Sequence, residues 1–237
     1  ATHPGPAGPT GTMPLLLGRS LVTADAAQGA PSTVDAAPDE ARVRLVLRVL
    51  TAAAFVVILN ETLMMNALPP LIDVFAIDAT VGQWLTTGFM LTMAVVIPMT
   101  GWLLQRVSIQ TAYALAMGTF IVGTTLCALA PTFSILLLGR VVQAAGTAVM
   151  MPLLMTTIMT LVPVHRRGRV MGNLTLAMSV APAMGPTVSG VILQLGSWRW
   201  LFGLVLPIAL VMAMAGVRLL RGSEPGRPAR LDLLSVL

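Results

Sequence analysis

The sequence predicts an all-α membrane protein with six transmembrane helices. Hydrophobic residues make up 56% of its 237 residues and charged residues only 10%, whereas a soluble domain carries about 25% charged residues. Uncharged stretches run through Ala79–Gln105, Val107–Gly139, Val141–Val164 and Val170–Trp198. A helix needs about 20 predominantly apolar residues to cross a bilayer, so each of these stretches can hold at least one span.

The spans are expected, in chain order, at residues 44–68, 82–105, 110–130, 134–162, 170–195 and 199–220. Residues 1–40 are rich in Pro, Gly, Ala and Ser, which predicts a disordered cytoplasmic tail before the bundle at 41–221. Residues 222–237 combine a polar linker with the apolar start of a further span, LDLLSVL, at which the sequence stops. This pattern indicates a fragment of a longer protein.

The arginines predict the orientation. With the N-terminus inside, eleven arginines lie on inner flanks and only Arg199 lies in an outer loop. Because cytoplasmic loops carry an excess of basic residues, we expect a multi-pass protein of the cell (plasma or inner) membrane with a cytoplasmic N-terminus.

Glu61 is the only acidic residue inside a predicted span, in the run FVVILNETLMMNALPPL. A charge at mid-bilayer depth costs about 2.5–3.5 kcal/mol on insertion scales. Removal from water favours the neutral acid and a nearby arginine favours the ion, so this carboxylate is a candidate proton carrier or counter-charge for a cationic substrate. The alternative is a structural carboxylate tied to an arginine.

Arg140 is the only basic residue similarly placed, in LLLGRVVQAAGTAV. Gln143 and Thr147 follow at i+3 and i+7 and so share one helix face with it. A polar stripe in an apolar helix is typical of cavity lining, although an arginine near a helix end can also extend to the membrane surface.

Glu61 and Arg140 are expected at a similar depth. If span one ends at Leu68 and span four begins at Ser134, both residues lie about 9–11 Å below the outer ends of their helices. They could then pair directly, or through a polar side chain such as Asn60 or Gln143.

The sequence argues against soluble chemistry. His3 lies in the tail and His165 in a loop, and Cys127 is the only cysteine. No zinc-protease or phosphate-loop motif is present, and no basic run is interleaved with aromatic residues. We therefore expect neither an enzyme nor a metal site, and no cofactor or nucleic-acid partner.

Four motifs, in order along the chain, resemble the major facilitator superfamily. They look most like the N-terminal half of its fourteen-span drug:proton antiporter family, over about residues 55–221. The motifs are LNETLMMNALP (59–69), GRVVQAAGTAV (139–149), APAMGPTVSG (181–190) and WRWLFGLVLP (198–207).

The resemblance implies roles for particular residues. It implicates Arg140, with Gln143, in proton coupling. It makes the proline- and glycine-rich part of span five an antiporter motif, and interior prolines that remove helix hydrogen bonds favour a hinge there. The motif residues are Pro182, Gly185, Pro186 and Gly190.

The loop after span two departs from the family pattern. GWLLQRVSIQT keeps Gly101 and Arg106, but has Gln105 where the family has Asp and Ser108 where it has Gly. The charged cytoplasmic contact of the family is therefore not expected here.

The resemblance implies a major-facilitator bundle of two inverted three-helix repeats. It also implies proton-coupled efflux of lipophilic drugs, cationic ones above all, or of other small molecules. The expected partners are a drug-like substrate, protons, the lipid bilayer and a C-terminal half of the same transporter. A solute:proton symporter of the same fold, or a non-transporting membrane scaffold or sensor, remains open.

Overall fold

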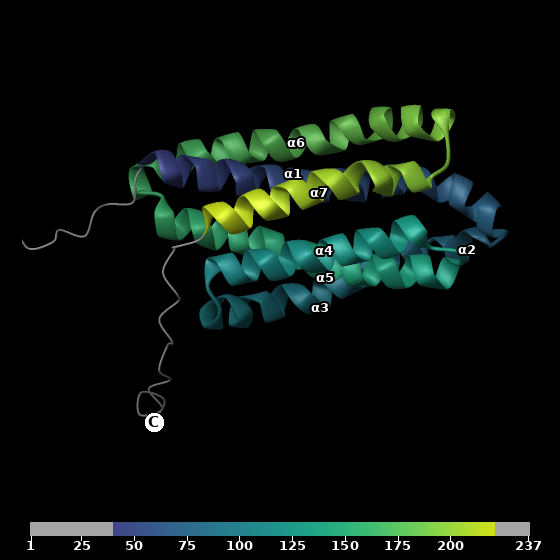
Figure 1. Ribbon diagram of the computed structural model, residues 1–237, viewed down its shortest axis with the longest axis horizontal. Helices are drawn as coiled ribbons and strands as arrows, with labels where there is room; N and C mark the ends of the chain where they lie inside the picture. The colour runs from purple at the N-terminus through teal and green to yellow at the C-terminus, as the bar shows by residue number, and fades with distance from the viewer. Residues whose placement is uncertain (1–39, 221–237) are drawn as a thin grey trace, which may run out of the picture. The chain divides into compact units, whose positions relative to one another are not determined.

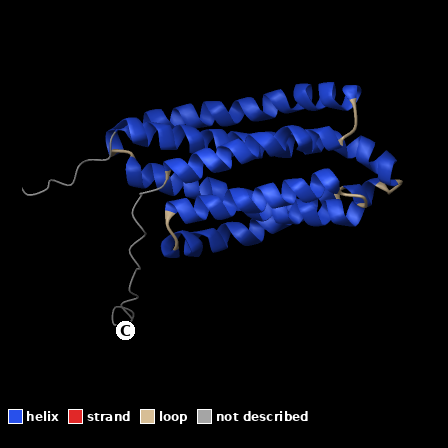
Figure 2. Cartoon of the chain, in the orientation of Figure 1, coloured by secondary structure: helices blue, strands red, loops and turns tan. Residues whose placement is uncertain are grey.

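A computed structural model describes residues 40–220, and its regular structure there is entirely helical (Figure 2). Six of its helices are long and apolar enough to cross a membrane, and α2 is a single turn before α3. The predicted tail, linker and truncated span lie outside the described residues. The helices are α1 (Glu40–Phe75), α2 (Ala79–Gly82), α3 (Trp84–Arg106), α4 (Ile109–Leu129), α5 (Phe133–Leu161), α6 (Val164–Leu195) and α7 (Arg199–Leu219).

The all-α six-span prediction is confirmed, but two boundaries are wrong. α1 continues through Pro69 and Pro70 to Phe75 instead of ending at Leu68. Prolines are tolerated inside transmembrane helices when neighbouring groups compensate, and Leu71, just beyond the pair, is fully buried and belongs to the core.

α6 begins at Val164 rather than at 170, because the basic run predicted as a loop forms its first turns. Arg167 also closes the end of α5: its Nε donates to the carbonyl of Val162 at 3.0 Å and its Nη2 to that of Met159 at 2.7 Å.

The helices pack with an internal two-fold pattern. α1 packs against α6 and α7, and α5 packs against α3 and α4. Exchanging α1 with α5, α3 with α6 and α4 with α7 turns the contacts of α1 with α6 and α7 into the contacts of α5 with α3 and α4. Consecutive helices alternate in direction (Figure 1), so α1 and α5 run antiparallel. The expected pair of inverted three-helix repeats is therefore present.

The two ends of the bundle differ in chemistry. At one end, Phe75 of α1, Phe133 of α5 and Trp198, the residue before α7, form an aromatic cluster, with centroids 6.3 Å apart for Phe75–Phe133 and 5.7 Å apart for Phe75–Trp198. Arg199 there donates to the carbonyl of Ala130 at 2.8 Å. The other end carries the remaining described arginines outside the core: Arg42, Arg44, Arg48, Arg106, Arg166, Arg167, Arg169 and Arg218.

Candidate functional site

A buried polar network lies inside the bundle and begins at Arg140 of α5, which is only 1% exposed. Its Nη1 donates to Oε1 of Gln143 at 2.7 Å, and Nε2 of Gln143 donates to Oγ1 of Thr124 at 2.7 Å. Thr124 in turn donates to the carbonyl of Phe120 on its own helix. The Nη1 donor of this buried charged group is thus satisfied through a chain of hydrogen bonds, as burial favours.

The Arg140 guanidinium also lies over the ring of Phe89 on α3, with Cζ 4.0 Å from the ring centroid. A desolvated cation over an aromatic face is stabilised by about 2 kcal/mol. Two buried nitrogens in this part of the bundle have no hydrogen-bond partner: Nε of Arg140 and Nδ2 of Asn60, on α1. The site therefore retains unused donor capacity.

Glycines allow the network to form. A side chain at Gly123 of α4 would collide with the backbone of Gln143, and one at Gly139 of α5 would lie 2.7 Å from Sγ of Cys127. Small residues let transmembrane helices approach this closely. The close approach of α4 and α5 brings Thr124 within reach of Gln143.

Glu61 lies half-buried on α1 and interacts electrostatically with Arg140. Among the described residues the two form no direct ion pair, so the direct pairing that the sequence allowed is not present. Arg140 uses Gln143 as its hydrogen-bond partner instead.

The helix ends from which a shared depth was predicted for Glu61 and Arg140 differ in the structure, and the shared depth stays a prediction. Glu61 lies 14 residues before the end of α1 at Phe75, and Arg140 lies seven residues after the start of α5 at Phe133. These separations correspond to about 21 Å and about 10 Å. The two residues nonetheless come within electrostatic range.

The predicted hinge residues lie on α6, of which one face packs on α1. Gly185 is buried, and a side chain there would collide with the methyl group of Thr62, the residue after Glu61. Pro182 and Pro186 are exposed, and Gly190 has open space at its Cα. α6 stays helical through both prolines.

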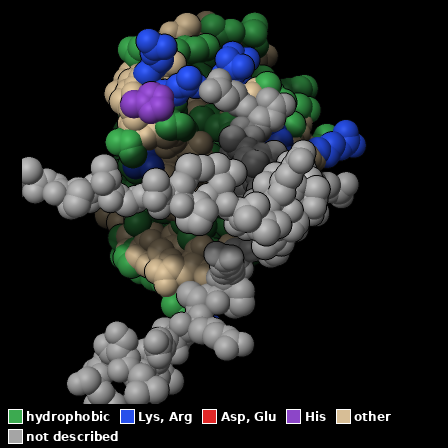
Figure 3. Space-filling view, turned by 90° about the vertical axis from the view of Figure 1, so that its left-hand side faces the viewer, with side chains coloured by type: hydrophobic (Ala, Val, Ile, Leu, Met, Phe, Trp, Pro, Cys, Tyr) green, Lys and Arg blue, Asp and Glu red, His purple; other side chains and the backbone are tan. Residues whose placement is uncertain are grey.

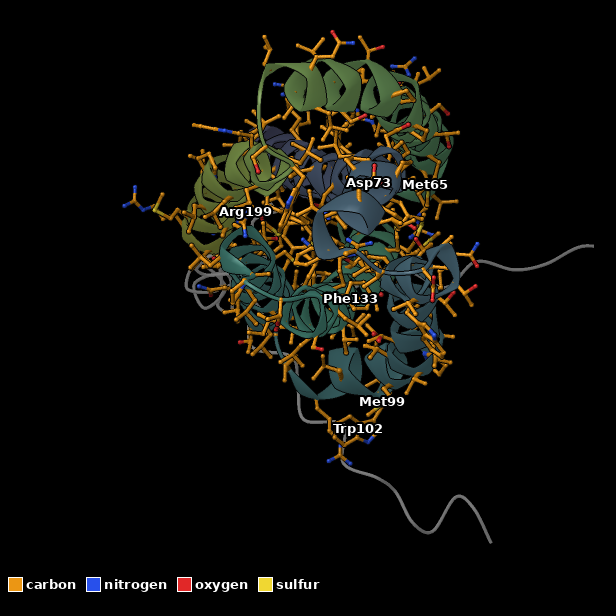
Figure 4. The ribbon with its side chains drawn as sticks, turned by 90° about the vertical axis from the view of Figure 1, so that its right-hand side faces the viewer. Met65, Asp73, Met99, Trp102, Phe133 and Arg199 are labelled. Carbon is orange, nitrogen blue, oxygen red and sulfur yellow. The ribbon has the colours of Figure 1, made fainter. Side chains whose placement is uncertain are left out.

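The loop-motif residues lie away from this network. Arg106 is 17 residues beyond Phe89 on α3, about 25 Å along the helix axis, and stacks on Trp102 with Cζ 4.3 Å from the ring centroid. Trp102 projects outward from the bundle (Figure 4). Gly101 has no neighbour within 4 Å of an added Cβ.

Ser108, which stands where the family has Gly, and Gln110, two residues further in the same run, make structural contacts. Ser108 caps α4 by accepting from the Thr111 backbone at 3.1 Å, and Gln110 donates to the carbonyl of Val217 on α7 at 3.2 Å.

Sequence reasoning missed Thr124 and Phe89. The run GTFIVGTT (118–125) places a polar side chain beside a glycine inside an apolar span, which could have pointed to Thr124. Nothing distinguishes Phe89 from the other five phenylalanines of the chain. The described residues contain no group of three or more His, Cys, Asp or Glu that could hold a metal ion.

Comparison with known proteins places the chain in a wider context. The family described as Major Facilitator Superfamily matches residues 50–233. The uncharacterized MFS-type transporter YcnB of Bacillus subtilis is 42% identical over 193 residues, which are 81% of this chain and 41% of that protein. The lincomycin resistance protein LmrB of Listeria monocytogenes is 40% identical over 185 residues, 78% of this chain and 39% of that protein.

A solved structure of the peptide transporter POT in complex with sulfate shares the fold, with a TM-score of 0.70 at 14% identity, over 81% of this chain and 42% of that one. The chain thus spans about two-fifths of the length of the curated relatives and of the solved structure that it matches.

Proposed function

The chain belongs to the major facilitator superfamily, and on that premise we propose that it forms part of a proton-coupled exporter of lipophilic drug molecules. The described bundle would form one wall of the transport path, and a further part of the polypeptide would form the other. The resistance named for LmrB, a relative of 40% identity, supports a drug substrate.

One observation carries the proton-coupling proposal: a half-buried carboxylate, Glu61, lies within electrostatic range of the fully buried Arg140. The guanidinium holds a hydrogen bond to Gln143 and leaves its Nε unpartnered. Loss of a proton from Glu61 would therefore create an ion beside a fixed cation. Binding of a cationic drug and binding of a proton would compete for the same negative charge.

The test replaces Glu61 with glutamine in the full-length protein. Glu61→Gln keeps the shape of the protonated acid but cannot exchange a proton, so drug-dependent proton flux in proteoliposomes should disappear. Asp73→Asn is the matched control, because Asp73 lies on the same helix but is exposed near its end. This control should transport normally.

Unchanged drug-dependent proton flux in Glu61→Gln would overturn the coupling role. The direction of flux separates the alternatives: an exporter moves drug and protons in opposite directions, and a symporter moves both in the same direction. Absence of any flux in the wild-type protein would favour a scaffold or sensor.

We further propose that the arginine-rich end of the bundle faces the cytoplasm. In a Cys127→Ala background, a cysteine at the exposed Asp78 should react with an impermeant thiol reagent from outside. A cysteine at the exposed Gly168 should react only from inside. The reverse pattern would contradict this orientation.

A further inference from the structure

A cavity of about 1000 Å³ opens between α1 and α6 at the arginine-rich end of the bundle. Figure 3 looks onto this end, where arginine side chains and a histidine gather. Five of the lining residues are arginine or histidine, among them Arg48, His165 and Arg169. The buried polar network of Arg140 contributes no residue to this cavity.

The cavity crosses the boundary between charged and apolar sequence. After Arg48, α1 carries no charge until Glu61, and after Arg169, α6 carries none to its end. Phe55 and Ala177, which also line the cavity, lie seven and eight residues further along these helices, or about 10–12 Å deeper. The cavity therefore has a cationic rim and an apolar floor.

Among the described residues, none that lines the cavity is acidic. Glu61 lies 13 residues beyond Arg48 on α1, about 20 Å along the axis, and Asp73 and Asp78 lie at the opposite end of the bundle. Arginine recognises phosphate through paired, charge-assisted hydrogen bonds, and basic groups at a membrane surface attract acidic lipids.

We propose that this cavity binds an amphipathic phosphate ester. The phosphate lies between Arg48, His165 and Arg169, and the apolar part lies on the floor of the cavity. Its volume matches an organic ligand rather than a bare inorganic ion. An acidic phospholipid of the bilayer and a soluble phosphorylated amphiphile share this chemistry. The inference does not depend on the proposed function, because it concerns binding and not transport.

The test uses the full-length protein in phosphatidylcholine nanodiscs with and without phosphatidylglycerol. Phosphatidylglycerol should raise the melting temperature, because a ligand that binds only the folded state stabilises it. In the double variant Arg48→Gln/Arg169→Gln the apparent affinity should fall at least about tenfold, since two charge-assisted contacts are lost. Arg218→Gln is the control: it removes an exposed arginine at the same end that does not line the cavity.

A second variant tests the apolar floor. Ala177→Leu fills part of it without changing the charge, and should weaken phosphatidylglycerol binding while leaving the rim intact. Equal affinity in this variant, or in the double arginine variant, would overturn the proposal.

A third arm adds sn-glycerol 3-phosphate to nanodiscs of phosphatidylcholine alone. A melting shift there that Arg48→Gln/Arg169→Gln removes and Ala177→Leu keeps would mean that the phosphate alone is recognised. The proposal of an amphipathic ligand would then be wrong. No shift there, with the phosphatidylglycerol shift present, assigns the site to the lipid. No shift with either molecule overturns it.

Discussion

α5 and α6 are consecutive helices of similar length, and both carry motif residues, yet they are held very differently. Of an apolar 18-residue stretch in each helix, 56% of the residues are buried in α5 and 17% in α6. Figure 1 shows α6 at one edge of the bundle, beside α1. α5 instead packs against both α3 and α4.

The difference in burial shows that motif residues on two neighbouring helices can be held by different contacts. The polar residues of α5 bond within the bundle, through Gln143 to Thr124. α6 buries a narrow stripe that includes Ala181, Gly185 and Ser189, and leaves both of its prolines exposed. Substitutions at the buried positions of α5 should therefore lower stability as well as disturb the polar network, whereas those on the outer face of α6 should act mainly on function.

The largest difference in stability is expected between two glycine-to-leucine variants, one on α5 and one on α6. A side chain at Gly146 of α5 would collide with the backbone of Ala116 and Phe120 on α4. Backbone atoms inside a helix cannot move aside as the end of a flexible side chain can. Gly146→Leu should lower the free energy of unfolding by about 3 kcal/mol or more. Gly190→Leu, with open space, should change it by less than about 0.5 kcal/mol. Denaturant titration in mixed micelles measures both, and equal losses would remove the contrast.

A second contrast concerns buried polar groups. Gln143→Leu removes the hydrogen-bond acceptor of Arg140 Nη1, and stranding a buried charged donor should cost about 2–3 kcal/mol. Ser189 on α6 is equally buried but donates only to Pro186 of its own helix, at 3.1 Å. Ser189→Ala should therefore cost about 0.5–1 kcal/mol. The same titration decides this, and a larger loss in Ser189→Ala would reverse the order.

The sequence predicts the features that are determined within a single helix. The number of spans follows from the apolar stretches, and the bond between Arg140 and Gln143 follows from their i+3 spacing, since such residues are neighbours on a helix. The end of α1 could not be predicted in this way. Pro69 and Pro70 normally indicate a break, but the helix continues through them and the residues beyond pack into the core, which is a tertiary feature.

Features that join two helices were harder to predict. Thr124 and Phe89 reach Arg140 from α4 and α3, and their partners are set by tertiary packing rather than by spacing. The same holds for the contact between Gly185 and Thr62. Sequence patterns therefore indicated Arg140 and Gln143 of the buried polar network, but not the side chains from other helices that surround them, and the role of Glu61 stays a prediction.

The contact between α6 and α1 should have a smaller effect on stability, which a pair of substitutions can test. Gly185→Ala places a methyl group against the Thr62 methyl and should cost about 1–2 kcal/mol. Thr62→Ser removes that methyl and keeps a hydroxyl for the bond to Ile58. The double variant should recover at least about 0.5 kcal/mol relative to additivity. Strictly additive losses in the same titration would mean that this contact does not explain the need for glycine.

The smallest effect on stability should accompany a large effect on function. Gly190 of α6 and Gly118 of α4 both have open space at the Cα, so leucine at either position should leave the melting temperature of the full-length protein nearly unchanged. If the outer face of α6 meets a moving part of the transporter, Gly190→Leu should block drug efflux. Gly118→Leu, on a helix that packs between α5 and α7, should not. Efflux by Gly190→Leu at the wild-type rate would show that this face takes no part in transport, and the functional half of the contrast between α5 and α6 would fail.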